Sequence, residues 1–394
     1  MADDPASRAI EAAARDAYGR LVAWLGARSR DLAGAEDALA DAFAAALATW
    51  PRDGVPERPQ AWLLTTARRR MIDAARRRRT RDDAIPTLLL ATTEAETPDD
   101  IPDERLKLLF VCAHPAIDPA ARTPLMLQTV LGMTATTIAA AFLVAPAAMS
   151  QRLVRAKEKI RAAGIGFRVP EPDELPERLD AVLHAIYAAY GTGWEDAAAN
   201  PLADEAIWLV RLLAHLLPNE PETRGLLALL LFCESRRDAR RENGRFIPLV
   251  LQKIARWSTP MLAEARHHLT TAGAMGRLGR FQLEAAIQSV HAARAETGTT
   301  DWEAIALLYE GLYALAPTTG IAVSRAAALA QARNATIALA ALDAIDAPSY
   351  QPYWALRAVL LHRLGRAIDA NAARHRAITL SNNAAVREYL AEGP

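Results

Sequence analysis

Residues Gln60–Arg79 of this chain read QAWLLTTARRRMIDAARRRR, and this stretch decides the fold of the N-terminal part. Its apolar residues Leu63, Ala67, Met71 and Ala74 recur at the spacing of one face of an α-helix. The opposite side of that helix carries arginines within an arc of roughly one third of the circumference. These are Arg68, Arg69, Arg76 and Arg79. The pattern predicts an amphipathic helix that packs by one side and presents concentrated positive charge on the other.

The charge of the chain is balanced overall but separated locally. The 394 residues include 46 basic and 46 acidic side chains, so the net charge is zero, yet Arg68–Arg81 alone holds eight arginines and one aspartate. Any affinity for nucleic acid must therefore come from such local segregation. A face of this kind can hold DNA phosphates without sequence preference. The plainer alternative is a solvated, arginine-rich surface.

A second pattern, Thr134–Arg161, is typical of a helix-turn-helix. Thr134 is suited to cap a first helix, Leu143–Ala145 forms the turn, and Pro146 suits the first position of a second helix. The second helix has a narrow apolar stripe at helical spacing. The stripe consists of Met149, Leu153, Ala156, Ile160 and Ala163.

The side of this second helix that faces away from the stripe has the residues that a DNA recognition helix needs. Arginine can pair with guanine through two hydrogen bonds, and glutamine can pair with adenine in the same way. The residues expected to face DNA are Ala147, Ala148, Gln151, Arg152, Arg155 and Lys159. Lys157 and Arg161 are further candidates for holding phosphates. An ordinary amphipathic helix with a basic surface is the alternative for this segment taken alone.

The composition favours an all-α fold. Hydrophobic residues make up 52% of the chain, alanine and leucine dominate, and no pair of strands is apparent. The length suits two to four domains. The two cysteines, Cys112 and Cys233, lack partners at zinc-site spacing, which fits a reducing compartment. No leader and no apolar segment of membrane length is apparent, so we expect a soluble, cytoplasmic protein without membrane contact.

Breaks in the pattern predict the domain boundaries. Acidic residues and prolines follow Arg81, and glycines and prolines follow Ala163. In Tyr353–Ala377 the small residues and a Leu-Gly turn are spaced as in tetratricopeptide (TPR) repeats. The expected segments are a helical bundle at 1–83, an acidic flexible linker at 84–103, the helix-turn-helix unit at 104–168, a proline-rich linker at 169–176, an α-helical domain at 177–290 and TPR-like repeats at 291–394.

Ala35–Phe43, followed by a loop at Trp50–Pro59 and then by Ala61–Arg76, resembles region 2 of the extracytoplasmic-function (ECF) sigma factors of bacterial RNA polymerase. The resemblance implies that Glu36, Asp37 and Asp41 dock on the clamp helices of the largest polymerase subunit. It also implies that the loop captures an unstacked base of the minus-ten promoter element, while the basic helix follows the adjacent DNA. A preformed pocket can offset part of the cost of unstacking a base.

Ile101–Lys157 resembles region 4 of the same family, which reads the minus-thirty-five element, and its Arg152–Lys157 run is the most specific part. Thr137 stands where the family usually has a glutamate that completes a capping box, so we expect a slightly weaker first helix. The stretch Cys112–Pro115 and the long C-terminal extension suggest the subgroup with a TPR-like C-terminal domain. The resemblance implies core RNA polymerase and promoter DNA as partners, and we expect a protein partner for the C-terminal domain.

No pattern typical of an enzyme is apparent, and we expect no catalytic residue, cofactor or metal. Two other readings stay open. One is a helix-turn-helix regulator that senses a ligand and does not depend on polymerase, and the other is a TPR-like scaffold whose arginines are only solvated.

Overall fold

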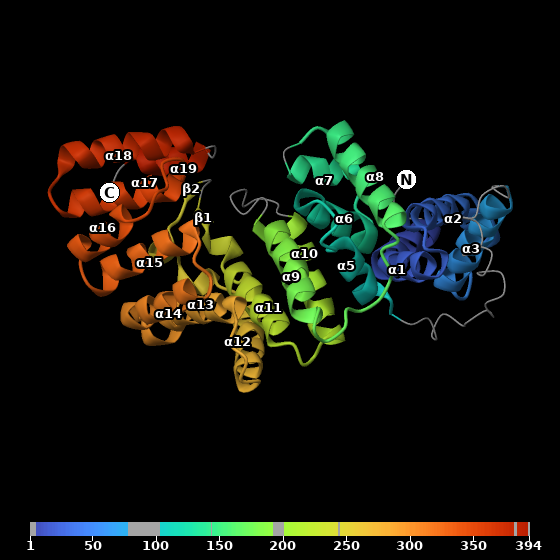
Figure 1. Ribbon diagram of the computed structural model, residues 1–394, viewed down its shortest axis with the longest axis horizontal. Coiled ribbons are helices and arrows are strands. Elements are labelled where there is room, and N and C mark those ends of the chain that lie inside the picture. Colours follow the sequence, from blue (N-terminus) through green and yellow to red (C-terminus); the bar gives the residue numbers. More distant parts are fainter. Residues whose placement is uncertain are drawn as a thin grey trace. The chain divides into compact units, whose positions relative to one another are not determined.

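The computed structural model describes residues 5–77, 103–142, 144–191, 201–242, 245–381 and 384–392. The chain forms two compact units, residues 1–192 and 193–394, each of which is described by itself (Figure 1). Both consist almost entirely of helices, which confirms the all-α prediction. None of the helices in the described ranges is long and apolar enough to cross a membrane.

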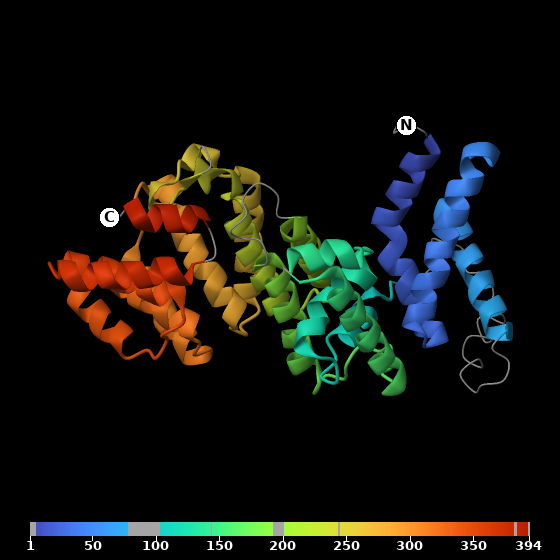
Figure 2. The same ribbon diagram turned by 90° about the horizontal axis from the view of Figure 1, so that it is seen from above.

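The first unit begins with a bundle of three helices: α1 (Pro5–Ser29), α2 (Leu32–Asp53) and α3 (Pro59–Arg77). Each helix packs on the other two, and all three lie side by side in Figure 2. Asp31 caps α2, since its carboxylate accepts a hydrogen bond from the Gly34 N–H at 2.9 Å. The core of the bundle is apolar and fully buried. It includes Trp24, Leu21, Leu25, Leu39, Ala46, Leu63 and Ala67.

A second group of helices in the same unit follows. It consists of α5 (Arg105–Cys112), α6 (Pro119–Leu131), α7 (Ala135–Ala141), α8 (Pro146–Ala162) and α9 (Leu175–Gly191). The turn after α6 needs glycine, because Gly132 has a φ of +71° in the left-handed region. The expected linker at 84–103 lies outside the described residues except for Asp103.

Helix α9 lies in the first unit, although the sequence suggested a boundary before it. It packs on α5 and α6. The Thr123 hydroxyl donates to the Ala185 carbonyl at 3.0 Å, and the Arg178 guanidinium donates to the Phe110 carbonyl at 2.7 Å. The helix therefore completes the core of the region that precedes it.

The described part of the second unit is a succession of helices with one small pair of strands. Its helices are α10 (Pro201–Leu216), α11 (Pro221–Glu234), α12 (Thr259–Ala274), α13 (Arg280–Thr297), α14 (Trp302–Leu315), α15 (Thr319–Ala332), α16 (Ala335–Asp343), α17 (Gln351–Arg363), α18 (Ala367–Leu380) and α19 (Ala384–Glu392), with short 3₁₀ turns at Arg237–Ala239, Leu249–Leu251 and Ile254–Arg256. Strands β1 (Arg241–Glu242) and β2 (Arg245–Phe246) pair antiparallel, with Arg241 opposite Phe246. The sequence did not predict this pair, because strands of two residues are too short to show alternation.

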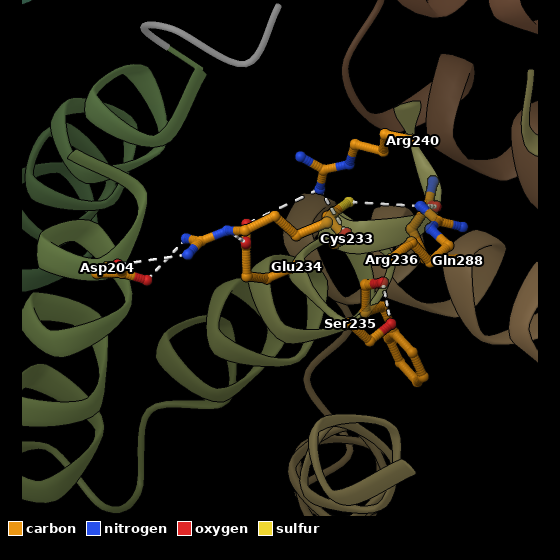
Figure 3. A network of polar contacts seen from close by, with 9 residues as sticks. Asp204, Cys233, Glu234, Ser235, Arg236, Arg240 and Gln288 are labelled. Carbon is orange, nitrogen blue, oxygen red and sulfur yellow. Dashed lines mark hydrogen bonds and ion pairs between the residues drawn. The ribbon is translucent and has the colours of Figure 1, made fainter. Parts of the chain in front are cut away.

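A polar network, buried at Glu234 and Arg236 and exposed at Asp204, joins three helices of the second unit (Figure 3). Glu234, at the end of α11 and only 3% exposed, forms an ion pair with Arg237. Arg237 also donates to Asp204 of α10 at 2.7 Å, and Arg236 donates to Gln288 of α13 at 2.7 Å. Buried charges are tolerated only when they are paired. The buried part of the network therefore ties the end of α11 to α13, and the exposed Arg237–Asp204 pair adds a contact with α10.

From α14 to α18, each helix packs on the next along the chain. A shared apolar core runs through α15–α18 and contains Ala326, Leu339, Leu342, Leu360 and Ala370. Packing of successive helices on their neighbours is compatible with a stack of helical repeats.

Candidate polymerase and nucleic-acid interface

The acidic residues of α2 divide between surface and interior. Asp37 and Asp41 are exposed and lie one turn apart, so they share a face of the helix. Glu36 lies about 100° further round the helix and is only 7% exposed. The side chains of Asp37 and Asp41 are accessible to a partner, whereas that of Glu36 faces the interior of the first unit.

Glu36 forms an ion pair with Lys157 of α8 at 2.5 Å, with side chains that are 8% and 14% exposed. Burial raises the pKa of Glu36, Lys157 opposes this shift, and the nearby Asp37 adds to it. Lys157, which the sequence suggested as a phosphate ligand, is thus engaged inside the protein. Sequence periodicity could not show this, because the partner lies on a distant helix.

The loop before α3 is shorter than the sequence suggested. Helix α2 continues through Pro51 to Asp53, so the connection comprises only residues 54–58. Trp50 is 2% exposed and its ring lies edge-on to that of Trp62, with centroids 5.5 Å apart. The Trp50 indole is buried within the helix, and α2 therefore continues past Pro51, which the sequence analysis had placed in a loop. The connection itself is exposed, and Gly54, with a φ of +84°, ends the helix.

Helix α3 separates an apolar side from a basic side, as predicted. Arg69 and Arg76 are exposed, and Arg68 is half-buried. Arg76 makes a long ion pair with Asp73, at 4.0 Å. Arg79 lies outside the described residues. The buried side consists of Leu63, Leu64, Ala67, Met71 and Ala75, so the last position of the expected stripe is taken by Ala75 where the sequence suggested Ala74.

The helix pair α7 and α8 lies where the sequence predicted two helices. The Thr134 hydroxyl caps α7 by accepting a hydrogen bond from the Thr137 N–H at 3.1 Å. The Thr134 and Thr137 hydroxyls also lie 2.8 Å apart, which is a contact between side chains and not the bond to the Thr134 N–H that a capping-box glutamate makes. Helix α8 begins at Pro146 and packs on α7.

The buried stripe of α8 was predicted correctly except at its end. Met149, Leu153, Ala156 and Ile160 are 5% exposed or less. Ala163 follows the last residue of the helix and is exposed, so its place in the stripe was wrong. The helix ends one residue too early for Ala163 to reach the core.

The outward face of α8 is accessible along its length. It presents Ala147, Ala148, Gln151, Arg155 and Lys159, all exposed. Arg152 is half-buried, and its guanidinium donates a long hydrogen bond to the Ala120 carbonyl at 3.4 Å. The small side chains of Ala147 and Ala148 leave room for a partner to come close to the start of the helix. Gln151 and Arg155 carry hydrogen-bond donors and acceptors of the kind that pair with base edges.

Two family models match parts of this chain. Residues 14–81 match sigma-70 region 2, a range that covers α2, α3 and α1 from residue 14 onward, and residues 178–273 match a family of unknown function, DUF6596. An uncharacterized protein of Rhizobium meliloti is 39% identical over 399 residues, which cover 97% of this chain and 93% of that protein. No solved structure matches.

The region 2 match covers both the acidic helix and the basic helix, so it supports a role as a sigma factor in promoter recognition by RNA polymerase. The similarity to the Rhizobium meliloti protein extends over nearly the whole length of both chains. The chain therefore belongs to the same family as that protein, and its N-terminal helices are a sigma-70 region 2 domain.

Proposed function

We propose that this chain is a sigma factor of the ECF type, which brings core RNA polymerase to promoters from within the cytoplasm. The observation that carries this proposal is the joint presence of a matched region 2 and of α8, whose exposed face holds Gln151 and Arg155. One surface is suited to phosphates and an unstacked strand, and the other to base edges in a major groove. Two such surfaces in one chain suit the two elements of a promoter.

Each surface has its own part in this function. Asp37 and Asp41 dock on basic residues of core polymerase, and complementary charge favours both the rate and the orientation of that encounter. The arginines of α3 hold the DNA of the minus-ten element. Helix α8 lies in the major groove of the minus-thirty-five element.

The second unit is a regulatory module that binds a protein partner. The chain of successive helices from α14 to α18 supports this role, because stacked helical repeats offer extended surfaces to peptides and partner helices.

Transcription with purified components tests the proposal. The chain is mixed with core RNA polymerase and a promoter library, and we expect promoter-specific transcripts that core enzyme alone does not produce. Specific binding to duplex DNA without any polymerase requirement would favour the ligand-sensing regulator instead. Indifference to both DNA and polymerase would favour the scaffold. Asp37→Lys with Asp41→Lys should weaken co-migration with core enzyme, and tight co-migration would contradict the docking role.

A chain that ends at Gly191 tests the regulatory role of the second unit. Its transcription should differ markedly from that of the full chain at equal concentration with the same core enzyme and promoter. Equal activity would remove the regulatory role.

A further inference from the structure

A cavity of about 260 Å³ lies in the first unit beside the last turns of α5 and α8 and the first turn of α9. Its walls are formed by His114, which follows α5, by Arg178 of α9, and by the segment after α8, which includes Gly164 and Arg168. Among the described residues, none that lines the cavity is acidic. The cavity therefore brings two guanidinium groups and an imidazole together from three separate segments of the chain.

The guanidinium of Arg178 is held in place by only one of its nitrogen atoms. Nη2 donates to the Phe110 carbonyl at 2.7 Å, and within the described ranges Nη1 makes no hydrogen bond. A guanidinium that is already oriented loses less freedom when it binds a further acceptor. Its second terminal nitrogen is therefore available to a ligand that carries negative charge.

His114 is oriented in a similar way. Its Nδ1 atom accepts a hydrogen bond from the Ala116 N–H at 3.1 Å, so the proton of the neutral ring is on Nε2. Burial and the positive charges of Arg178 and Arg122 lower the pKa of His114, and Glu174 opposes this shift. The ring is therefore neutral at pH 7, lies in positive surroundings, and has one N–H donor left for a ligand.

Capping of helix ends does not account for these cations. Helix α8 closes its own last turn, because the Gly164 N–H donates to the Arg161 carbonyl at 3.1 Å. Arg168 donates instead to Glu174 at 2.9 Å, and the two side chains are 54% and 44% exposed. An ion pair with this exposure contributes little to stability. Arg168 can therefore bind an anion at small cost to the fold.

We propose that this cavity binds the phosphate group of a small phosphate monoester. The donors of His114, Arg168 and Arg178 come from three segments, which suits the three terminal oxygens of a monoester better than the two oxygens of a planar carboxylate. A second cavity of about 420 Å³ is also lined by Arg178 and has room for the organic part of such a ligand. The site does not depend on the function proposed above.

Histidine NMR of the full chain measures binding at this cavity alone. The chain has eight histidines, and the signal that is lost in His114→Gln identifies the His114 ring. Inorganic phosphate, added at pH 7.5 and constant ionic strength, should shift this signal saturably, with half-saturation at or below about 10 mM. His291, which is buried in the second unit, is the reference and should not shift. A His114 signal that stays in place up to about 100 mM phosphate would overturn the proposal.

Arg168→Gln removes one donor without disturbing a helix, because Arg168 lies between α8 and α9. The half-saturating concentration of phosphate should rise at least about fivefold. Arg333→Gln is the matched control. Arg333 also pairs with a glutamate, Glu303, at 3.0 Å, and both side chains are more than half exposed, but it does not line the cavity. The control should leave the titration unchanged. A titration of Arg168→Gln that equals the wild type would contradict the proposed set of donors.

Glu174→Gln should have the opposite effect. The Glu174 carboxylate competes with the ligand for the Arg168 guanidinium. Its removal should lower the half-saturating concentration of phosphate at least about twofold. Weaker binding in this variant would show that the cavity does not hold an anion against Arg168.

Three further probes decide which anion the cavity accepts. Glycerol 3-phosphate, a monoester, should shift the His114 signal at concentrations no higher than inorganic phosphate. Acetate at the same ionic strength should bind at least about tenfold more weakly, because it reaches fewer donors. Duplex DNA has only diester phosphates and should leave the signal in place. A shift with acetate equal to that with phosphate, or a shift with DNA and none with the monoester, would overturn the proposal.

Discussion

At the scale of the residue, Glu222 in the second unit shows how a side chain from a distant helix can accept hydrogen bonds from the N–H groups at the start of another helix. Helix α13 begins after Gly279, which has no side chain to cap it. Glu222 of α11 takes this part, since its carboxylate accepts hydrogen bonds from the N–H groups of Phe281 at 2.9 Å and Gln282 at 3.1 Å. A negative charge at this position also interacts favourably with the helix dipole. Glu222 therefore holds α11 and α13 together.

Glu222→Ala should lower the free energy of unfolding by about 1–3 kcal/mol, because it leaves two N–H groups at a helix start without an acceptor. Glu222→Gln keeps an acceptor and should cost less. Glu303→Ala is a matched control, since Glu303 pairs with Arg333 on the surface, with both side chains more than half exposed, and such a pair contributes less than about 1 kcal/mol. Chemical denaturation measures all three, and equal losses for Glu222→Ala and Glu303→Ala would contradict the capping role.

His291 makes the stability of the second unit depend on pH. Burial and the positive charges of Arg236 and Arg294 lower its pKa to about 4, against about 6.5 in an unfolded chain. The unfolded form therefore binds a proton more readily. The contribution of neutral His291 to the free energy of unfolding is complete above pH 6.5. This contribution, up to about 3 kcal/mol, is lost as the pH falls toward 4.

His291→Gln should flatten this dependence. The difference in unfolding free energy between the wild type and His291→Gln, measured from pH 7.5 to pH 4.5, isolates the histidine from the other titrating groups. We expect the wild type to lose stability faster than the variant over this range. Parallel curves would show that His291 does not carry the effect.

At the scale of the element, α3 and α8 use the same amphipathic design for different contacts. Both bury an apolar stripe and expose basic residues. On α3 the exposed groups include three arginines, Arg69, Arg70 and Arg76, and arginines hold phosphates irrespective of sequence. On α8 they include Gln151 among cations, and a residue that both donates and accepts can discriminate between bases.

Substitutions on the two helices should therefore have different kinds of effect on promoter binding. Gln151→Ala or Arg155→Ala should relax discrimination at particular minus-thirty-five positions, by about 1–3 kcal/mol for each base pair read. Arg69→Ala or Arg76→Ala should weaken binding of the polymerase complex to all promoters alike and reduce the slope of log affinity against log salt by about 1. Binding to a panel of promoter variants at several salt concentrations measures both effects. A uniform loss from all four substitutions would contradict the assignment of α8.

At the scale of the whole molecule, the packing of α9 decides where the chain can be divided. Its buried face covers α5 and α6 with a set of apolar side chains. These are Leu179, Val182, Leu183, Ile186 and Tyr190. A division at the proline-rich segment before α9 would expose both this face and its partner surface.

A chain that ends at Gly191 should unfold cooperatively, whereas one that ends at Phe167 should be less stable by at least about 3 kcal/mol, or about 10 °C in Tm, because the apolar surface of α5 and α6 is then open to water. Thermal unfolding followed by circular dichroism compares the two. Equal melting temperatures would show that α9 is not part of the first unit.

The sequence by itself determined the class of the fold, the faces of α3 and α8 and the cap of α7. These features depend on helical periodicity and on side chains that bond to backbone groups a few residues away, so they can be predicted from a short segment of the sequence. Gln151 and Arg155 could be selected in the same way, whereas Asp37 and Asp41 were named together with Glu36 through the family resemblance. The roles of all these residues stay predictions.

Only the tertiary structure decided which polar residues are withdrawn from the surface and which helix belongs to which unit. Glu36 and Asp37 are neighbours of the same chemical type, yet one is buried against Lys157 and the other is exposed. Likewise, Trp50 lies within a helix because Trp62 packs on it, and α9 joins the first unit because α5 and α6 offer an apolar surface. Burial depends on what a distant part of the chain places against a residue, and no local pattern contains that information.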